Sequence, residues 1–396
     1  MGYRFHVLGL PHTASSKDYS GCAFTQKVVN FCAMMKARGH HVTHYGNELS
    51  KVSCDEHVTV TNADDISPPT LSGKYDETDE TYRKFARNAV IEIQKRKQPR
   101  DFLICMWATH KTISDQHQDM IHVEAGIGYP RAHFAKFKVF ESYAMLHAYR
   151  GLDAVATANG NGWWYDVVIP NYYDLEDFTF SETPGHYLAF LGMRSIGADG
   201  KGITIAFEVS QVSSRVLVVA GAGTMEVKPS HVDYVGFLGP AERRKLLSGA
   251  RALLAPSLFV EPFCGASVEA MLSGTPVICS DWGAFAENVI HGVTGFRCRT
   301  FEQFIWAVDN VGKLSRKTCH DWASRNFSLD RVGEMYDEYF WSVMNIYTGN
   351  GWYEPNPGRR DLDWLARHFP AVTDGGEDDS DQDQRLQARK DDVLGD

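Results

Sequence analysis

The chain passes repeatedly from a short apolar segment to a helical pattern and back, and this alternation restricts its possible folds more than any other feature. A strand pattern at 5–10 is followed by a helical pattern at 24–38, which Gly39 is expected to end before a second strand at 42–45. Strands that are separated by helices pair in parallel, so the sequence predicts an α/β fold with parallel sheets.

The same alternation continues through the second half of the chain. A helical pattern at 82–93 precedes further predicted strands at 102–107, 187–191, 216–220, 252–255 and 277–279. The polar, proline-containing stretch at 50–79 is expected to be a long loop or insertion.

At 396 residues the chain has room for two domains of ordinary size. A polar break at about 172–186 separates the two sets of strands and is the expected boundary. The sequence therefore predicts a first domain at 1–175, a second at 176–330, a helix at 331–350 that crosses back to the first, an extension at 351–372, and an acidic disordered tail at 373–396.

Composition and charge narrow the classes of partner. Hydrophobic residues make up 43% of the chain, yet no apolar run approaches the roughly 20 residues of a membrane span, and we expect a cytoplasmic protein without one. The net charge is −10, and most of it lies in the tail, where 374–396 holds nine acidic and three basic residues. This balance makes nucleic acid an unfavoured partner, although a local basic patch is not excluded by it.

The most informative stretch is EPFCGASVEAMLSGTPVICS, residues 261–280. Its apolar spacing predicts a helix whose first turn holds Gly265, Ala266 and Ser267, and the free amides of such a turn attract phosphate or another anion. Glu269 lies just inside this helix and Glu261 on the loop before it, so both carboxylates are positioned to meet one ligand. The alternative is a capped helix with two solvent-facing glutamates.

These residues stand among others that, in the same order, resemble a known family. The stretch is similar to the signature of retaining GT-B glycosyltransferases of the family 4 type, strongly over 165–300, weakly in the N-terminal half, and not in the tail. The segments that carry the resemblance are Ile169-Pro170-Asn171 with Asp174 and Phe178, 190–194 with Lys201-Gly202, Ala255-Pro256-Ser257, Glu261-Pro262-Phe263, Glu269-Ala270-Met271, 274–278, Glu287 and 292–296. The resemblance implies two Rossmann-like domains with parallel sheets that face a central cleft.

The resemblance also implies roles for single residues. Arg194 and Lys201 would neutralise the diphosphate of a nucleotide sugar and stabilise the charge on the leaving group, whereas most arginines and lysines are plain surface cations. Glu269 would bind the ribose hydroxyls and Glu261 a hydroxyl of the donor sugar. The other implied donor contacts are Phe263, Cys264, Gly265, Ala266 and Ser267 at the helix start, Gly21 in the turn after the first strand, and Phe237, a base-pocket candidate or a core aromatic.

The N-terminal half supplies the expected acceptor side. Glu124 stands where many relatives carry a histidine near the donor sugar, and it is a candidate catalytic residue together with Glu261, Arg194 and Lys201. The candidates for the acceptor cleft are His110, His122, Gly126, Tyr129 and Trp163, with His117 as a further site histidine. Packing roles are the alternative for each of them.

Neither a metal nor a permanently bound cofactor is implied. The eight cysteines form no CxxC pair, and the Asp-x-Asp triplets at 361–363, 379–381 and 381–383 lie far from the donor signature.

We therefore expect a retaining, metal-independent glycosyltransferase that moves a sugar from a UDP- or GDP-type nucleotide sugar to the hydroxyl of a glycan, protein or small molecule. The alternatives are a glycosyltransferase that modifies a nucleic-acid base and a GT-B-type nucleotide-sugar epimerase or phosphorylase. The sequence leaves the acceptor and the oligomeric state open.

Overall fold

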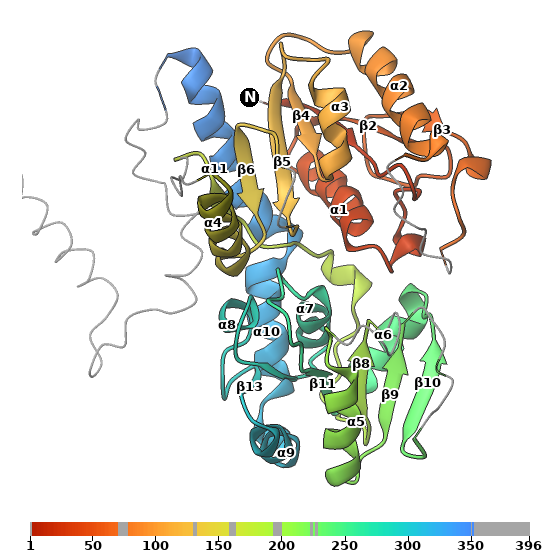
Figure 1. Cartoon of the computed structure of the whole chain (residues 1–396), viewed down its shortest axis with the longest axis vertical. Coiled ribbons are helices and arrows are strands. Elements are labelled where there is room, and N and C mark those ends of the chain that lie inside the picture. Colours follow the sequence, from red (N-terminus) through yellow and green to blue (C-terminus); the bar gives the residue numbers. More distant parts are fainter. Residues whose placement is uncertain are drawn as a thin grey trace, which may run out of the picture.

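The computed structural model contains two parallel sheets, each covered by helices and stacked along the long axis of the molecule (Figure 1). It describes residues 2–69, 78–129, 133–157, 164–192, 200–221, 225, 229–349 and 351. The acidic tail and the Asp-x-Asp triplets lie outside these residues. The two-sheet α/β architecture predicted from the sequence is confirmed.

The first sheet has seven strands, and every strand pair in it is parallel. In spatial order they are β3 (Glu56–Thr61), β2 (His41–Asn47), β1 (Arg4–Leu8), β4 (Phe102–Cys105), β5 (Ile121–Ile127), β6 (Phe137–Phe140) and β7 (Val167–Val168). Its helices are α1 (Ala23–Ala37), α2 (Glu80–Gln94), α3 (Lys111–Ser114) and α4 (Tyr143–Thr157).

The second sheet has six strands, again with all pairs parallel. In spatial order they are β10 (Val232–Gly236), β9 (Leu217–Ala220), β8 (Leu188–Leu191), β11 (Ala252–Ala255), β12 (Val277–Ser280) and β13 (Gly295–Cys298). Its helices are α5 (Ile203–Val212), α6 (Pro240–Gly249), α7 (Gly265–Leu272), α8 (Phe285–Asn288) and α9 (Phe301–Asn310).

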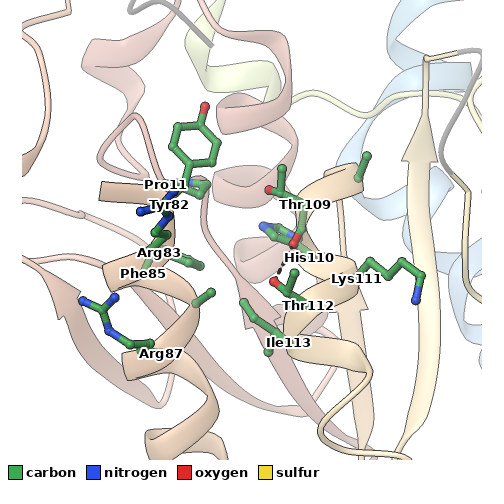
Figure 2. A pocket seen from close by; sticks show the side chains of 12 residues that line it. Pro11, Tyr82, Arg83, Phe85, Arg87, Thr109, His110, Lys111, Thr112 and Ile113 are labelled. Carbon is green, nitrogen blue, oxygen red and sulfur yellow. Dashed lines mark hydrogen bonds between the residues drawn. The ribbon is translucent and has the colours of Figure 1, made fainter. Parts of the chain in front are cut away.

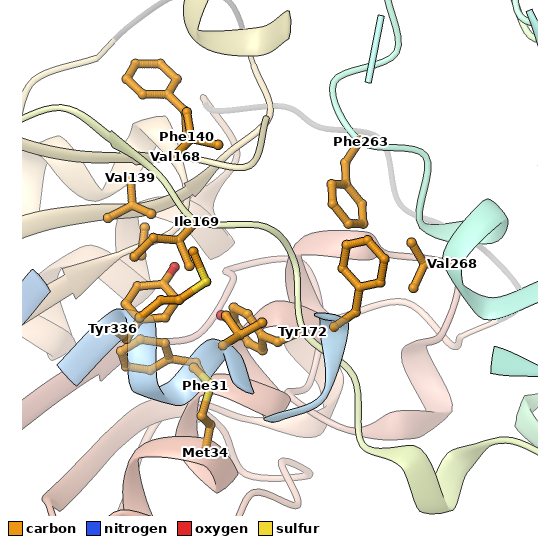
Figure 3. Packing of buried hydrophobic residues seen from close by; sticks show 14 of the residues in the cluster. Phe31, Met34, Val139, Phe140, Val168, Ile169, Tyr172, Phe263, Val268 and Tyr336 are labelled. Atoms are coloured by element: carbon orange, nitrogen blue, oxygen red, sulfur yellow. The ribbon is translucent and has the colours of Figure 1, made fainter. Parts of the chain in front are cut away.

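Two final helices, α10 (Arg316–Phe327) and α11 (Leu329–Thr348), run from the second sheet back to the first, where α11 lies beside it (Figure 1). Tyr336 of α11 packs edge-on against Phe31 of α1, with ring centroids 5.4 Å apart. One continuous set of buried apolar side chains includes these two residues and also Phe263 and Val268 of the second unit (Figure 3). The hydrophobic core therefore extends across the boundary between the two units.

The polar stretch at 50–79 differs from its prediction as a loop. It contains the edge strand β3, in which Val58 and Val60 are buried against the sheet while Thr59 is exposed. The alternation of buried and exposed residues in EHVTVT is typical of a strand with one buried face. Parallel pairing with β2 fixes which face is buried. Its polar flanks, with Pro68 and Pro69 on the carboxyl-terminal side, obscured this short pattern.

Helix α11 is 20 residues long, but acidic and basic side chains interrupt its apolar face. Within the described part of the chain, no helix has the length and apolar content that crossing a bilayer requires.

His44 of β2 is fully buried and is predicted to make stability depend on pH. Its ring contacts His57 Nδ1 at 2.9 Å and Ser15 Oγ at 3.0 Å, and burial followed by the neighbouring His57 lowers its pKa to about 3. At pH values between about 3 and the ordinary pKa of 6.5, His44 is protonated in the unfolded chain but neutral in the folded protein. The free energy of unfolding therefore falls as the pH is lowered, by about 1.4 kcal/mol per pH unit for this group.

We expect His44→Gln to flatten the pH dependence of urea unfolding between pH 6 and 4 by about that slope. His147→Gln, at an exposed position of α4, serves as the control. Equal slopes for wild type and His44→Gln would contradict the prediction.

Candidate functional site

Helix α7 begins at Gly265, directly after a loop that leaves the carboxyl end of β11. Cys264 caps it with a left-handed backbone conformation, φ 63°, which is uncommon for a residue with a side chain. A Cβ on Gly265 would lie 2.9 Å from the hydroxyl of Tyr173, so the chain segment between the two units approaches the helix start closely. The free amides of this turn make it an electropositive surface.

Glu261 lies beside this turn with only 2% of its surface exposed. Its Oε1 accepts hydrogen bonds from Lys201 Nζ and from Ser257 Oγ, each at 2.6 Å. The structure thus brings together Glu261 and Lys201, which are 60 residues apart in the chain. The Glu261 carboxylate would be costly to bury alone, so its pairing with Lys201 offsets that cost and holds both side chains in place.

Lys201 keeps its positive charge in this setting. Burial by itself would lower its pKa, but the neighbouring Cys264 and the Glu261 carboxylate outweigh burial, and the pKa is raised. The side chain is still 42% exposed, so the ammonium group is accessible to a ligand. Gly202 follows in a left-handed conformation, φ 74°, and caps α5.

Glu269 is also paired. Its Oε2 lies 2.6 Å from Arg243 Nη2 on α6, while no described residue donates a hydrogen bond to Oε1. Arg243 Nη1 reaches the carbonyl of Ser20 in the first unit at 3.3 Å. Arg243 is a site residue that sequence reasoning missed, because nothing in PAERRKL distinguishes it from the basic residues around it.

Gly21 and Phe237, both expected donor contacts, meet across the boundary between the two units. A Cβ on Gly21 would lie 3.0 Å from Phe237 Cε2, so only glycine allows this approach without displacing the ring. Phe237 is half-buried and follows β10. The structure therefore places the turn after β1 against the loop after β10.

The remaining residues of the α7 start make mainly internal contacts. Ser267 Oγ donates to the Cys264 carbonyl at 2.7 Å, and burial raises the pKa of the Cys264 thiol to about 12, so Cys264 is no nucleophile. The Phe263 ring is buried and stands edge-on to Phe327 at 5.8 Å. Ala266 is partly buried within the same turn. Their backbone, more than their side chains, is available to a ligand.

Glu124 does not join this cluster. It is fully buried in β5, where one oxygen accepts from the amides of Phe134 and Ala135 at 2.9 and 2.8 Å and the other from the Tyr129 hydroxyl at 3.1 Å. Both oxygens are thus used in holding the loop between β5 and β6. The geometry gives Glu124 and Tyr129 structural contacts and none to Lys201 or Glu261.

The expected acceptor histidines also bind backbone. His110 is buried, and its Nε2 lies 3.0 Å from the Gly9 carbonyl; burial lowers its pKa to about 3. His122 lies near the amino end of β5, where it contacts Ser114 Oγ and the His117 carbonyl, both at 2.8 Å. His117 is buried as well. Gly126, with φ 65°, lies beside the Lys27 side chain, and Arg194 and Trp163 fall outside the described residues.

His110 does line a cavity of about 520 Å³ between α2 and α3, with Pro11, Tyr82, Arg83 and Lys111 (Figure 2). None of the residues around α7 contributes to it. The cavity is therefore separate from the Lys201, Glu261 and Glu269 cluster. Among the described residues, no group of three or more His, Cys, Asp or Glu side chains is arranged to hold a metal ion.

Comparison with known sequences finds that part of the chain is similar to a family of sugar-transferring enzymes. Residues 190–312 match the family described as glycosyl transferases group 1. An uncharacterised glycosyltransferase of Methanocaldococcus jannaschii is 30% identical over 149 residues, which is 33% of this chain and 36% of that protein. The chain thus matches only about a third of the length of this curated relative.

Solved structures extend the likeness to most of the chain. Sucrose-phosphate synthase from Thermosynechococcus elongatus is 15% identical with a TM-score of 0.63, and the match covers 86% of this chain and 99% of that one. HepE of Anabaena, solved with UDP and glucose, is 14% identical with a TM-score of 0.59, and the match covers 86% of this chain and all of HepE. The fold is that of the GT-B glycosyltransferases.

Two glycines with the same backbone angle provide a test of how tightly Gly202, the residue after Lys201, packs against the neighbouring backbone. Gly202 and Gly236 both have φ 74°, but a Cβ on Gly202 would lie 2.0 Å from the Pro256 carbonyl oxygen, whereas Gly236 has open space. Alanine costs roughly 1–2 kcal/mol at such an angle.

We expect Gly236→Ala to lose about this much stability, and Gly202→Ala to lose at least about 2 kcal/mol more, because backbone must move. Urea unfolding measures both. Equal losses would show that the contact between Gly202 and Pro256 is not tight.

Proposed function

We propose that this chain is a retaining glycosyltransferase that moves a sugar from a nucleoside-diphosphate sugar to an acceptor hydroxyl. The observation that carries the proposal is the convergence of Lys201, Glu261 and Glu269 on the first turn of α7. A matching family over 190–312 and GT-B structural neighbours, one of them solved with UDP and glucose, support it.

The charges of this cluster suit a diphosphate. The site has an exposed ammonium group at Lys201 and free amides at the start of α7, and the family resemblance adds Arg194. Together they would neutralise the phosphates and stabilise the negative charge that builds on the leaving group. The scheme requires no metal ion, because these groups supply the positive charge.

The two glutamates suit the hydroxyl-bearing ends of the donor. Glu269 retains Oε1 for a ribose hydroxyl while Arg243 holds Oε2, so its orientation is fixed before the donor binds. Glu261 is held by Lys201 and Ser257 at the sugar side. Phe237 adjoins the Gly21 turn and would stack near the base.

In the transfer step, the bond between the anomeric carbon and the phosphate oxygen breaks, and its electron pair goes to the departing diphosphate. The acceptor oxygen bonds to the same face of the sugar, and its proton passes to a leaving phosphate oxygen. No side chain needs to act as the nucleophile, which agrees with the engaged oxygens of Glu124.

Replacing the Glu269 carboxylate tests the donor site. We expect Glu269→Gln to weaken nucleoside diphosphate binding roughly 10- to 100-fold, because a hydrogen bond to a charged group contributes about 1.5–3 kcal/mol. Titration calorimetry with UDP, GDP and ADP measures this, after the panel has identified the nucleotide that wild type binds.

Glu334→Gln is the control for that titration, since Glu334 is 49% exposed on α11 and pairs only with the same helix through Arg331. Unchanged affinity in Glu269→Gln would remove Glu269 from the site. No binding of any nucleotide by wild type would overturn the proposed function.

The stereochemical part of the proposal has its own test. We expect the product to keep the anomeric configuration of the donor, and turnover to be insensitive to EDTA. Proton NMR of the product of a glycan or simple alcohol acceptor reads the anomeric coupling directly. An inverted product would refute retention while leaving nucleotide-sugar transfer intact.

A further inference from the structure

A buried ion pair lies at the carboxyl edge of the first sheet and has no part in the scheme above. Lys27 of α1 pairs with Oε2 of Glu141, the residue that follows β6, and the two side chains are only 6% and 5% exposed. Lys27 Nζ also donates to the Gly126 carbonyl at 2.8 Å and lies 4.2 Å from the centroid of the Phe24 ring. In a parallel α/β sheet, ligands bind at this edge.

Two glycines at the end of β5 leave room for the pair. A Cβ on Gly128 would lie 2.1 Å from Glu141 Oε1, and one on Gly126 would lie 3.0 Å from Lys27 Cδ. The backbone of β5 is thus free of side chains where the two charged groups pass it. The space around the pair is built into the sheet.

The pair is satisfied on one side only. Glu141 Oε2 receives Lys27 and, at 2.8 Å, the Asn171 side-chain amide, whereas no described residue donates a hydrogen bond to Oε1. Glu124, in the neighbouring strand, has both oxygens engaged. A buried ion pair is a poor source of stability, so a buried pair with an unused acceptor oxygen is better explained by ligand binding.

Contacts along the chain connect Glu141 to the second unit, because Asn171, which donates to Glu141 Oε2, lies two residues before Tyr173 in the segment between the units. After burial and Glu269, the Glu141 carboxylate is the next contributor to the raised pKa of Tyr173, whose hydroxyl adjoins Gly265. The Glu141 carboxylate also raises the pKa of Lys201, by less than Cys264 and Glu261 do. Glu141 is therefore connected through Asn171 to the Tyr173 segment, whose hydroxyl adjoins the start of α7.

We propose that Glu141 Oε1 accepts a hydrogen bond from a hydroxyl of the sugar being transferred. A carboxylate repels a diphosphate, so the phosphates lie at Lys201 and the α7 start, and a neutral, hydroxyl-bearing group lies between them and Glu141. Lys27 and Asn171 are positioning residues, because they fix Oε2 and so aim Oε1. This inference rests on the proposed function.

The test compares nucleotide and nucleotide sugar on the same protein. Calorimetry with UDP, UDP-glucose, UDP-N-acetylglucosamine, GDP and GDP-mannose gives, for each sugar, its affinity relative to the bare nucleotide. We expect Glu141→Gln to bind the bare nucleotide within about twofold of wild type and to lose roughly 10- to 100-fold of the preference for the sugar.

Gly128→Ala should reduce the same preference without removing a charge, since its Cβ displaces Oε1. Asp101→Asn is the matched control, because Asp101 is a buried, ion-paired carboxylate at the amino end of β4, the opposite edge of this sheet. If Glu141→Gln does not fold, the double variant Lys27→Met with Glu141→Gln removes both buried charges and takes its place.

If these variants keep the full sugar preference of wild type, the inference is overturned and the proposed function stands. The same holds if wild type binds none of the nucleotide sugars more tightly than the bare nucleotide. If Glu141→Gln raises the KM for the acceptor but keeps the sugar preference, the hydroxyl that binds Oε1 belongs to the acceptor. That result would also overturn the inference. Failure of wild type to bind any nucleotide would overturn both proposals.

Discussion

Two segments of the chain cross between the sheets, and their hydrogen bonds to each other set how the two units meet. The Tyr173 amide donates to the Phe327 carbonyl at 2.8 Å, and the Leu329 amide donates to the Tyr173 carbonyl at 3.1 Å. Because the Tyr173 hydroxyl adjoins Gly265, this junction also fixes the start of α7 relative to the first sheet. Asn171, two residues before Tyr173, donates to Glu141, so the same junction also connects the Lys27–Glu141 pair to the start of α7.

The carboxylates Glu124, Glu141, Glu261 and Glu269 fall into two kinds. Glu124 has both oxygens engaged by its own unit and stabilises a loop. Glu261, Glu269 and Glu141 each have one oxygen held by a cation, which fixes their direction, and none has its other oxygen bonded by a described residue. Holding a polar group rigid while leaving it incompletely bonded costs folding free energy, and a ligand that completes the bonding recovers it.

The sequence predicted the parts that depend on local pattern. The strand at 252–255 coincides with β11, and the helix expected after Cys264 begins at Gly265, because apolar period and glycine placement are local properties. Arg243 and Glu141 could not be found this way, since their roles arise from contacts between distant segments: Arg243 with Ser20, and Glu141 with Lys27. The short strand β3 was missed because its polar flanks, one of them containing Pro68 and Pro69, suggested a loop.

Glu124 lies in β5 and Glu141 directly follows the neighbouring β6, and the two differ in how many of their oxygens are engaged. Neighbouring parallel strands end at one edge, so a side chain that follows β6 can occupy space beside the end of β5. Here Gly128 contributes no side chain, and Glu141 fills the position that a larger residue at 128 would occupy. The sequence shows which strand carries each carboxylate, whereas the placement of Glu141 beside the end of β5 is visible only in the three-dimensional contacts.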